Sequence, residues 1–213
     1  MKKVIYGVFA FAALTLTACG GTENTEEPTI EAEMVEEEVV MAEYNLNTDE
    51  SKLEWAGSWI GGKNDGKSHN GVINIIDGVM YQEGDKMKGK FAIDMSSIDV
   101  QDLDEASGKP KLQGHLASED FFNINQYALT EVKVLDVMDG NAKIMIVIAG
   151  KGMERTVPVS IETDEGTMTM KGDFTLDFAE GDLAGMKVNP KKPEEGKVSS
   201  DIAFKLHVVM NKK

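Results

Sequence analysis

Apolar and polar residues alternate along much of the chain after residue 44. The stretches 87–95, 167–178 and 197–210 carry an apolar side chain at nearly every second position. A period of two places one set of side chains inside and the other in water, as in a half-buried β-strand. The inward sets are Met87, Phe91, Ile93 and Met95; Met168, Met170, Phe174, Leu176 and Phe178; and Val198, Ile202, Phe204, Leu206, Val208 and Met210.

Short polar turns separate these stretches from further strands. Many consecutive strands joined by short turns favour an antiparallel up-and-down sheet, and a sheet of about eight strands loses its edges by closing into a barrel. We therefore predict an all-β fold, an antiparallel up-and-down β-barrel of about eight strands, with a β-sandwich as the alternative. The further strands are expected at 51–60, 70–76, 78–83, 129–137, 142–149 and 155–163, with turns at Asp77-Gly78, Glu83-Gly84-Asp85, Asp139-Gly140-Asn141 and Asp164-Glu165-Gly166.

Two segments interrupt the alternation. Residues 102–126 contain a short helix that we expect to begin near Pro110, because proline is tolerated in a first helical turn. Residues 180–197 are a loop rich in Gly, Pro and Lys. We expect the first segment to form a short helical lid on the barrel, with Phe121 and Phe122 as its apolar plugs and Ser118 as a cap of the turn that carries them.

Methionine and phenylalanine dominate the inward sets. Methionine is flexible and repacks around irregular guests, while barrels of about eight strands are either filled by their own side chains or hold one small ligand. The pattern alone leaves both possibilities open.

The first residues have the features of a bacterial targeting segment. Two lysines precede an apolar run at 4–16 that is too short to span a membrane. The run leads into Leu16-Thr17-Ala18-Cys19-Gly20, which resembles a lipobox, so residues 1–18 are predicted to be a lipoprotein signal peptide and Cys19 the lipidated N-terminus. An ordinary secretory signal with a chance cysteine is the alternative. Because Cys19 is the only cysteine, the folded part has no disulfide, CxxC pair or catalytic thiol.

Residues 19–43 are predicted to be an acidic flexible tether. They contain nine glutamates and no Lys or Arg, so they cannot bury enough apolar surface to fold alone. An acidic interaction tail is the alternative. Several acyl chains on one residue anchor a protein stably, which predicts a cell-envelope protein that is attached to the membrane without spanning it. Since the signal contributes +2 and the tether −9, residues 44–213 carry −8 of the net −15, which excludes a nucleic-acid or anionic-headgroup surface.

Motifs for catalysis or cofactors are absent from the sequence. There is no G-x-S-x-G elbow, no phosphate-binding G-x-x-x-x-G-K-[ST] loop and no dinucleotide G-x-G-x-x-G between strand and helix. The three histidines, His69, His115 and His207, form no H-x₃-H or H-E-x-x-H pair, so a metal site would require distant residues to converge. His207 falls on the polar face of the last strand. We therefore predict no cofactor, no metal and no enzymatic activity.

Several segments resemble the YceI-like domain family, a lipocalin-like barrel. "GKFAIDMSSI" at 89–98 is similar to the family strand G-x-F-x-I-D-M-x-S-I, and "HLASEDFF" at 115–122 is similar to its H-L-x-S-x-D-F-F. Weaker similarity is found in the opening stretch 44–55, in 69–78 and in "DIAFKL" at 201–206. The chain departs from the family at Tyr127-Ala128, where Tyr-Pro is frequent, at 150–156, and at Phe178, where an arginine is frequent.

The resemblance implies that 44–213 form one barrel that carries a long isoprenoid or other apolar lipid without catalysis. Each CH₂ moved from water into such a cavity contributes about 0.8 kcal/mol, so an apolar chain needs few polar contacts.

The residues after Cys19 lack an aspartate retention signal, which favours the outer membrane, facing the periplasm. Two alternatives remain: a metal-binding or enzymatic barrel using His69 and His115, and a filled barrel acting through its tether. The expected ligand-binding residues are Phe91, Ile93, Met95, Leu116, Phe121, Phe122, Met168, Met170, Phe174, Leu176, Ile202, Phe204 and Leu206, with His69 and His115 as headgroup contacts.

Overall fold

The computed structural model of the chain describes residues 41–213. The predicted signal peptide at 1–18, the lipidated Cys19 and the tether up to residue 40 lie outside the described residues. The strands are β1 (Met41–Ile60), β2 (Ser68–Glu83), β3 (Lys86–Val100), β4 (Leu129–Met138), β5 (Asn141–Ile148), β6 (Lys151–Pro158), β7 (Ser160–Asp164), β8 (Thr167–Asp177), β9 (Lys197–Val198) and β10 (Asp201–Lys212). The helices are α1 (Lys109–Ala117) and the 3₁₀ turns η1 (Gly62–Asn64), η2 (Ala179–Gly181), η3 (Ala184–Met186) and η4 (Pro193–Glu195).

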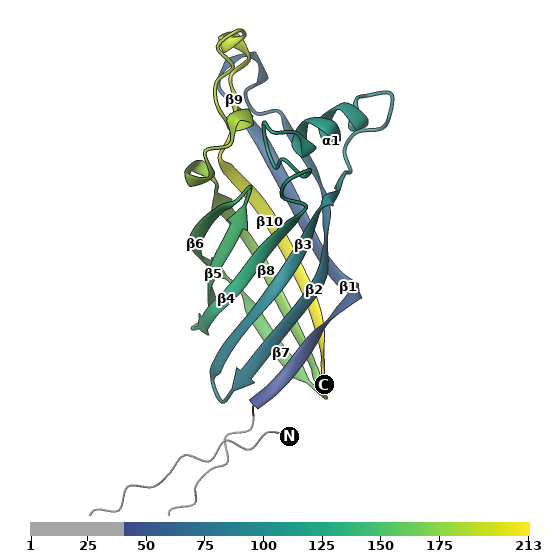
Figure 1. The fold of residues 1–213 in the computed structure, drawn as a ribbon, viewed down its shortest axis with the longest axis vertical. Helices are drawn as coiled ribbons and strands as arrows, with labels where there is room; N and C mark the ends of the chain where they lie inside the picture. Colours follow the sequence, from purple (N-terminus) through teal and green to yellow (C-terminus); the bar gives the residue numbers. More distant parts are fainter. Residues whose placement is uncertain (1–40) are drawn as a thin grey trace, which may run out of the picture. The chain divides into compact units, whose positions relative to one another are not determined.

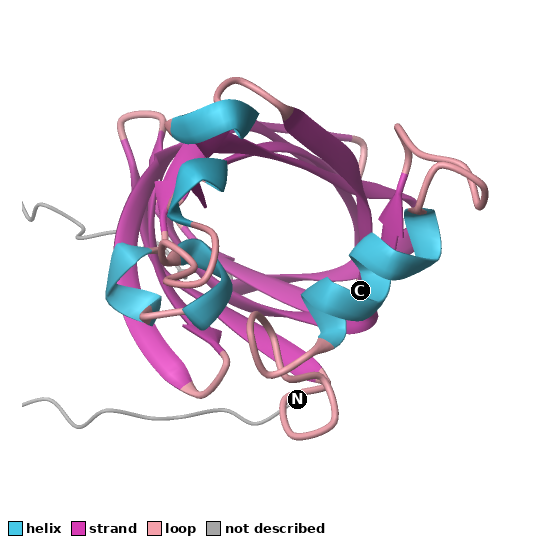
Figure 2. Cartoon of the chain, turned by 90° about the horizontal axis from the view of Figure 1, so that it is seen from above, coloured by secondary structure: helices cyan, strands magenta, loops and turns pink. Residues whose placement is uncertain are grey.

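The strands form one antiparallel sheet that curls into a barrel. Neighbouring strands follow the order β6-β5-β4-β3-β2-β1-β10-β8-β7, with β9 paired to β1. The two edge strands of this order, β6 and β7, are adjacent in sequence and separated only by a break at Val159. β6 pairs with β5, and β7 pairs with β8. If β6 and β7 count as one bent strand, the barrel has eight strands, and Figure 2 shows the resulting ring from above. The predicted up-and-down barrel is confirmed.

The longest strands exceed their predicted bounds. β1 begins at Met41, where it pairs with Glu83 of β2, so the strand starts before the expected domain boundary at Tyr44. The predicted turn at Asp77-Gly78 is wrong, because β2 runs through it and shifts its register with β3 there. The absence of a side chain at Gly78 instead leaves room for the ring of Phe91. A Cβ on it would lie 2.3 Å from the ring of Phe91 on the paired strand.

The period-two pattern correctly identifies the interior. Phe91, Ile93 and Met95 of β3 are buried, as are Met168 and Met170 of β8. His207 of β10 is exposed, as expected for the polar face. The inner faces of the strands form a single core cluster. Three of its methionines, Met80, Met168 and Met210, have no exposed surface, so one part of the barrel is filled by side chains.

The two interruptions of the pattern lie at the end of the barrel opposite the C-terminus (Figure 1). The predicted helix is present as α1, which follows Gly108 and has Pro110 in its first turn. Gly108 has φ 108°, a backbone conformation that side chains other than glycine rarely adopt. The segment 180–197 contributes η3, η4 and the beginning of β9. The barrel therefore has an end with a helical covering and an end closed by tight turns.

Candidate functional site

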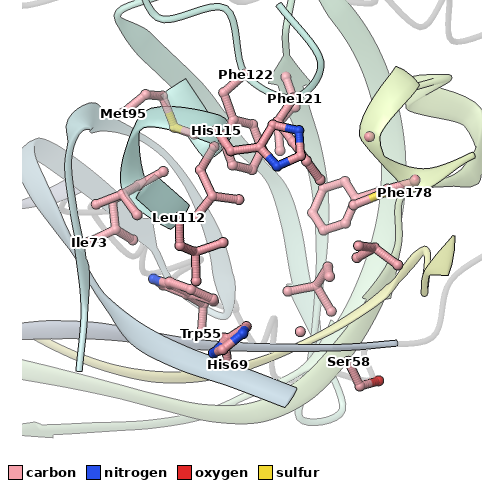
Figure 3. A pocket seen from close by; sticks show the side chains of 18 of the residues that line it. Trp55, Ser58, His69, Ile73, Met95, Leu112, His115, Phe121, Phe122 and Phe178 are labelled. Carbon is pink, nitrogen blue, oxygen red and sulfur yellow. The ribbon is translucent and has the colours of Figure 1, made fainter. Parts of the chain in front are cut away.

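A cavity of about 510 Å³ lies inside the barrel at the end that carries α1. Its wall is formed by the inner faces of β1 to β5 and β10, and its cover by α1 and the segments after α1 and β8. This volume falls in the range of small-molecule sites, which are mostly apolar with a few polar groups. Figure 3 shows Trp55, Ile73, Met95 and Leu112 converging on this space.

The lid is formed by two segments that are distant in sequence. The amide of Gly185 in η3 donates a 2.6 Å hydrogen bond to the carbonyl oxygen of Asp120, which lies after α1. Phe121 is 5% exposed, and its ring covers Gly185 so closely that a Cβ there would lie 2.1 Å from it. Phe122 is half-buried, with its ring centroid 6.2 Å from that of Phe121. Both phenylalanines line the cavity from above, as the sequence predicts for plugs of a lid.

Ser118 closes the turn between α1 and these phenylalanines. Its hydroxyl donates a 2.7 Å hydrogen bond to the carbonyl of His115, and it accepts one of 3.3 Å from the amide of Asp120. Its own carbonyl accepts the amide of Phe121 at 3.1 Å. The expected capping role of Ser118 is confirmed, at the C-terminal end of α1.

His69 links the barrel wall to the segment that precedes α1. Its Nδ1 lies 2.9 Å from Oδ2 of Asp102, and Oδ1 of the same carboxylate accepts the amide of Asn70 at 3.1 Å. Burial alone would raise the pKa of Asp102, but the hydrogen bonds from His69 and Asn70 outweigh it and hold the pKa below its ordinary value. Asp102 is therefore a fixed anion at the rim of the cavity.

His115 lies on the other side of the opening, in α1. Its Nε2 is 3.1 Å from Oδ2 of Asp120, and its side chain is 51% exposed. The imidazole meets the Phe121 ring edge-on, with 5.0 Å between centroids. Both His69 and His115 line the cavity, together with Lys111, so nitrogen-bearing side chains gather at the rim while the interior is apolar.

Arg155, the only arginine in the sequence, secures the segment after β8. Its guanidinium donates hydrogen bonds of 2.7 and 3.2 Å to the carbonyl of Asp177 and lies 3.0 Å from Glu180. Hydrogen bonds from the Ala179 amide and the Ser200 hydroxyl, with the charge of Arg155, lower the pKa of the Asp177 carboxyl. This cluster holds η2, and with it the base of the η3 arm of the lid, against β6.

The structure divides the predicted ligand-binding residues into two groups. Ile93, Met95, Leu116, Phe121, Phe122, Ile202 and Phe204 line the cavity. The residues that do not line it belong to the core cluster or pack against it, and they are Phe91, Met168, Met170, Phe174, Leu176 and Leu206. Phe174, for example, has its ring centroid 6.1 Å from that of Phe204. Contact of either group with a ligand stays a prediction.

Several lining residues were not identified from the sequence. Leu53 and Trp55 come from the predicted strand 51–60 and Ile146 and Ile148 from 142–149, two strands to which the sequence analysis assigned no inner face. Trp59 also lines the cavity, which therefore contains both tryptophans of the sequence. The Trp55 indole is fixed by a 3.4 Å hydrogen bond from Nε1 to the carbonyl of Val72. A tryptophan in an otherwise aliphatic inner set is a signal that could have been used.

Two other features, a cluster of metal ligands and a membrane-spanning helix, are not found between residues 41 and 213. No three His, Cys, Asp or Glu side chains in this part of the chain gather as metal ligands would. None of the helices within it is long and apolar enough to cross a membrane.

Comparisons with known proteins agree with this architecture. No curated protein sequence matches the chain. The BcnA structure from Burkholderia cenocepacia superposes with a TM-score of 0.60 at 18% identity, covering 77% of this chain and 98% of BcnA. A polyisoprenoid binding domain from Saccharophagus degradans, implicated in plant cell wall breakdown, gives 0.59 at 11% identity, covering 80% and 98%. At such identities the likeness concerns the fold. The model of the YceI-like domain family matches residues 44–210, most of the chain, and the protein therefore belongs to the YceI-like domain family.

Proposed function

We propose that the protein binds the long apolar chain of an isoprenoid or similar lipid inside its barrel. The observation that carries this proposal is the apolar cavity of about 510 Å³ beneath a lid whose two arms meet at Asp120 and Gly185. Moving such a chain from water into the cavity is worth about 0.8 kcal/mol per CH₂, so affinity needs no polar contact at depth. A barrel filled throughout by its own side chains would leave no such space.

The polar groups at the rim suit the headgroup of such a lipid. His69, His115 and Lys111 lie where the interior meets solvent, and each can donate a hydrogen bond. Membership of the YceI-like domain family and the fold shared with the polyisoprenoid binding domain of Saccharophagus degradans support the isoprenoid class.

Binding without catalysis is the second part of the proposal. Each rim histidine is paired with a carboxylate, but the hydroxyls of two serines on either side of α1 are directed elsewhere. Ser107 bonds to Asp104, and Ser118 donates to a backbone carbonyl. A histidine–carboxylate pair activates a nucleophile only when the hydroxyl lies within hydrogen-bonding reach of the ring.

We also propose that the barrel is held at the membrane of the cell envelope through lipidated Cys19 and the acidic tether. The resemblance of Leu16-Thr17-Ala18-Cys19-Gly20 to a lipobox supports the anchor, and the lack of an aspartate after it supports the outer membrane, facing the periplasm. Such an anchor would keep the cavity close to a source of apolar chains.

A pair of substitutions on β5 tests the binding proposal. Ile146 lines the cavity, whereas Val147 pairs with the exposed residues Glu131 and Gly152 on the outer face. Ile146→Phe fills part of the cavity, and Val147→Phe adds the same ring outside. Titration with a water-soluble geranylgeranyl probe, followed by tryptophan fluorescence, should show binding by wild type and Val147→Phe and at least tenfold weaker binding by Ile146→Phe. Equal affinity of all three proteins would contradict binding inside the barrel.

A further inference from the structure

On β3 the lining of the cavity stops at Ile93. Ile93 of β3 lines the cavity, while Phe91, two residues nearer the base on the same inner face, is 9% exposed and does not. Its ring lies over Gly78 of the paired strand, so closely that a Cβ there would come within 2.3 Å. The space that a side chain at position 78 would take is thus occupied by the ring. Phe91 is therefore the first inner residue of β3 below the cavity, at the level that we call its floor.

Below this floor the barrel is filled. Met80, Met168 and Met210 have no exposed surface, and the register places Met168 opposite Met210 and Met80 opposite Tyr44. These side chains belong to the core cluster that includes Phe91. The base of the described barrel is therefore filled by this methionine layer.

We propose that this floor sets the length of the apolar chain that the protein selects, with Phe91 in the layer that blocks the chain end from the base of the barrel. The inference rests on the proposed lipid binding and adds its length specificity. If each non-hydrogen atom occupies about 30 Å³, the share of a water molecule in the liquid, the cavity holds roughly 17 such atoms. That number corresponds to three or four isoprene units. Any further units remain outside the lid and add little affinity.

The test measures affinity against chain length. The probes are prenyl chains of two, three, four, five and eight isoprene units, each on the same uncharged oligoethylene glycol headgroup and used below its aggregation concentration. Fluorescence of Trp55 and Trp59, both of which line the cavity, reports occupancy. For the wild type, Kd should fall by more than about tenfold per unit up to four units, because each unit buries five more carbons. From four to eight units the change should be less than about twofold, because the added carbons stay exposed.

Substitution of the floor should move the plateau. Phe91→Ala removes six ring carbons, slightly more than one isoprene unit, so the five-unit probe should gain about tenfold over the four-unit probe. Phe174→Ala is the matched control, because Phe174 does not line the cavity and packs beside Phe204 on the paired strand, and its plateau should stay at four units. Should Phe91→Ala fail to fold, Phe91→Leu should shift preference in the same direction by a smaller factor.

The outcomes separate the two proposals. Binding of short and long probes with a steady rise in affinity to eight units, or an unchanged plateau in a folded Phe91 variant, overturns the length inference and leaves lipid binding intact. A plateau shift of equal size in Phe174→Ala also overturns the role of Phe91. Failure of every probe to bind the wild type overturns lipid binding and the length inference with it.

Discussion

The contact between Phe121 and Gly185 joins the two arms of the lid, and adding one methyl group tests it. In Gly185→Ala the new Cβ would lie 2.1, 2.4 and 2.6 Å from three atoms of the Phe121 ring. Carbon atoms in contact prefer about 3.5–4.0 Å, so the ring and η3 must separate by about 1.5 Å. Gly185 lacks the positive φ that would itself strain an alanine, so the effect comes from crowding.

The expected cost follows from this displacement. Overpacking a filled site costs about 1–3 kcal/mol, and the lower entropy of the unfolded alanine chain offsets about 0.4–1 kcal/mol. Gly185→Ala should therefore lower the free energy of unfolding by about 1–2 kcal/mol. With its lid displaced, the protein should also bind the geranylgeranyl probe about tenfold more weakly, which corresponds to about 1.4 kcal/mol of binding free energy.

Urea denaturation followed by tryptophan fluorescence measures the stability, and amide hydrogen exchange at residue 185 reports the bond to Asp120. Gly114→Ala in α1 is the control, because a Cβ at Gly114 meets nothing within 4 Å. It should be neutral or stabilise the protein by up to about 1 kcal/mol. Phe121→Leu combined with Gly185→Ala should recover part of the loss. A Gly185→Ala protein with wild-type stability, exchange and affinity would refute the lid geometry.

Three further predictions concern the lid, the rim and the turn after β8. Phe121→Ala with Phe122→Ala should weaken probe binding at least tenfold or destabilise the protein by more than about 3 kcal/mol, because two rings leave the underside of the lid; His115→Ala, at a half-exposed site, should change either quantity much less. The pKa of Asp102 is lowered, so the stability that its carboxylate contributes is present above the ordinary pKa of 3.8 and is lost as the pH falls through the lowered pKa. In urea denaturation, the difference in the free energy of unfolding between wild type and Asp102→Asn should therefore shrink from pH 5 to pH 3. Arg155→Met should cost about 1–3 kcal/mol in the same assay, because it removes charged hydrogen bonds to the turn after β8.

Each of these predictions has a clear contrary result. A double phenylalanine variant with unchanged affinity and stability would show that the lid does not retain the chain. A pH-independent effect of Asp102→Asn over the same interval would show that the carboxylate is not a stabilising anion. Lys143→Met is the control for Arg155, because it loses only an exposed ion pair with Glu154 and should change stability by less than about 0.5 kcal/mol. If Arg155→Met costs no more stability than Lys143→Met, Arg155 does not anchor the turn after β8.

The sequence predicts the barrel because alternation is a local property. Each strand reveals its inner face through its own residues, as Phe91, Ile93 and Met95 do in β3. The bulge near Asp77-Gly78 was mistaken for a turn because the same dipeptide serves both. What distinguishes the two is the ring of Phe91 on the neighbouring strand, which no local window contains.

The site could be predicted only in part, for a related reason. Ile93 and Phe91 carry the same signal of burial, yet Ile93 lines the cavity and Phe91 does not. Which inner positions border space depends on how side chains from facing strands meet. Similarly, the pair of His69 with Asp102 joins residues 33 positions apart, and no spacing rule indicates it. The lid phenylalanines are predictable because they belong to the HLASEDFF motif, which lies outside the alternation.

The most direct test of lipid binding is native mass spectrometry of the full-length protein purified from its own envelope without added lipid, followed by organic extraction. We expect a complex with one apolar chain per barrel. Extraction should release the chain as an isoprenoid or a similar long-chain lipid, and the Ile146→Phe protein should retain it poorly. A protein that is always empty, and that takes up no isoprenoid probe afterwards, would contradict the account.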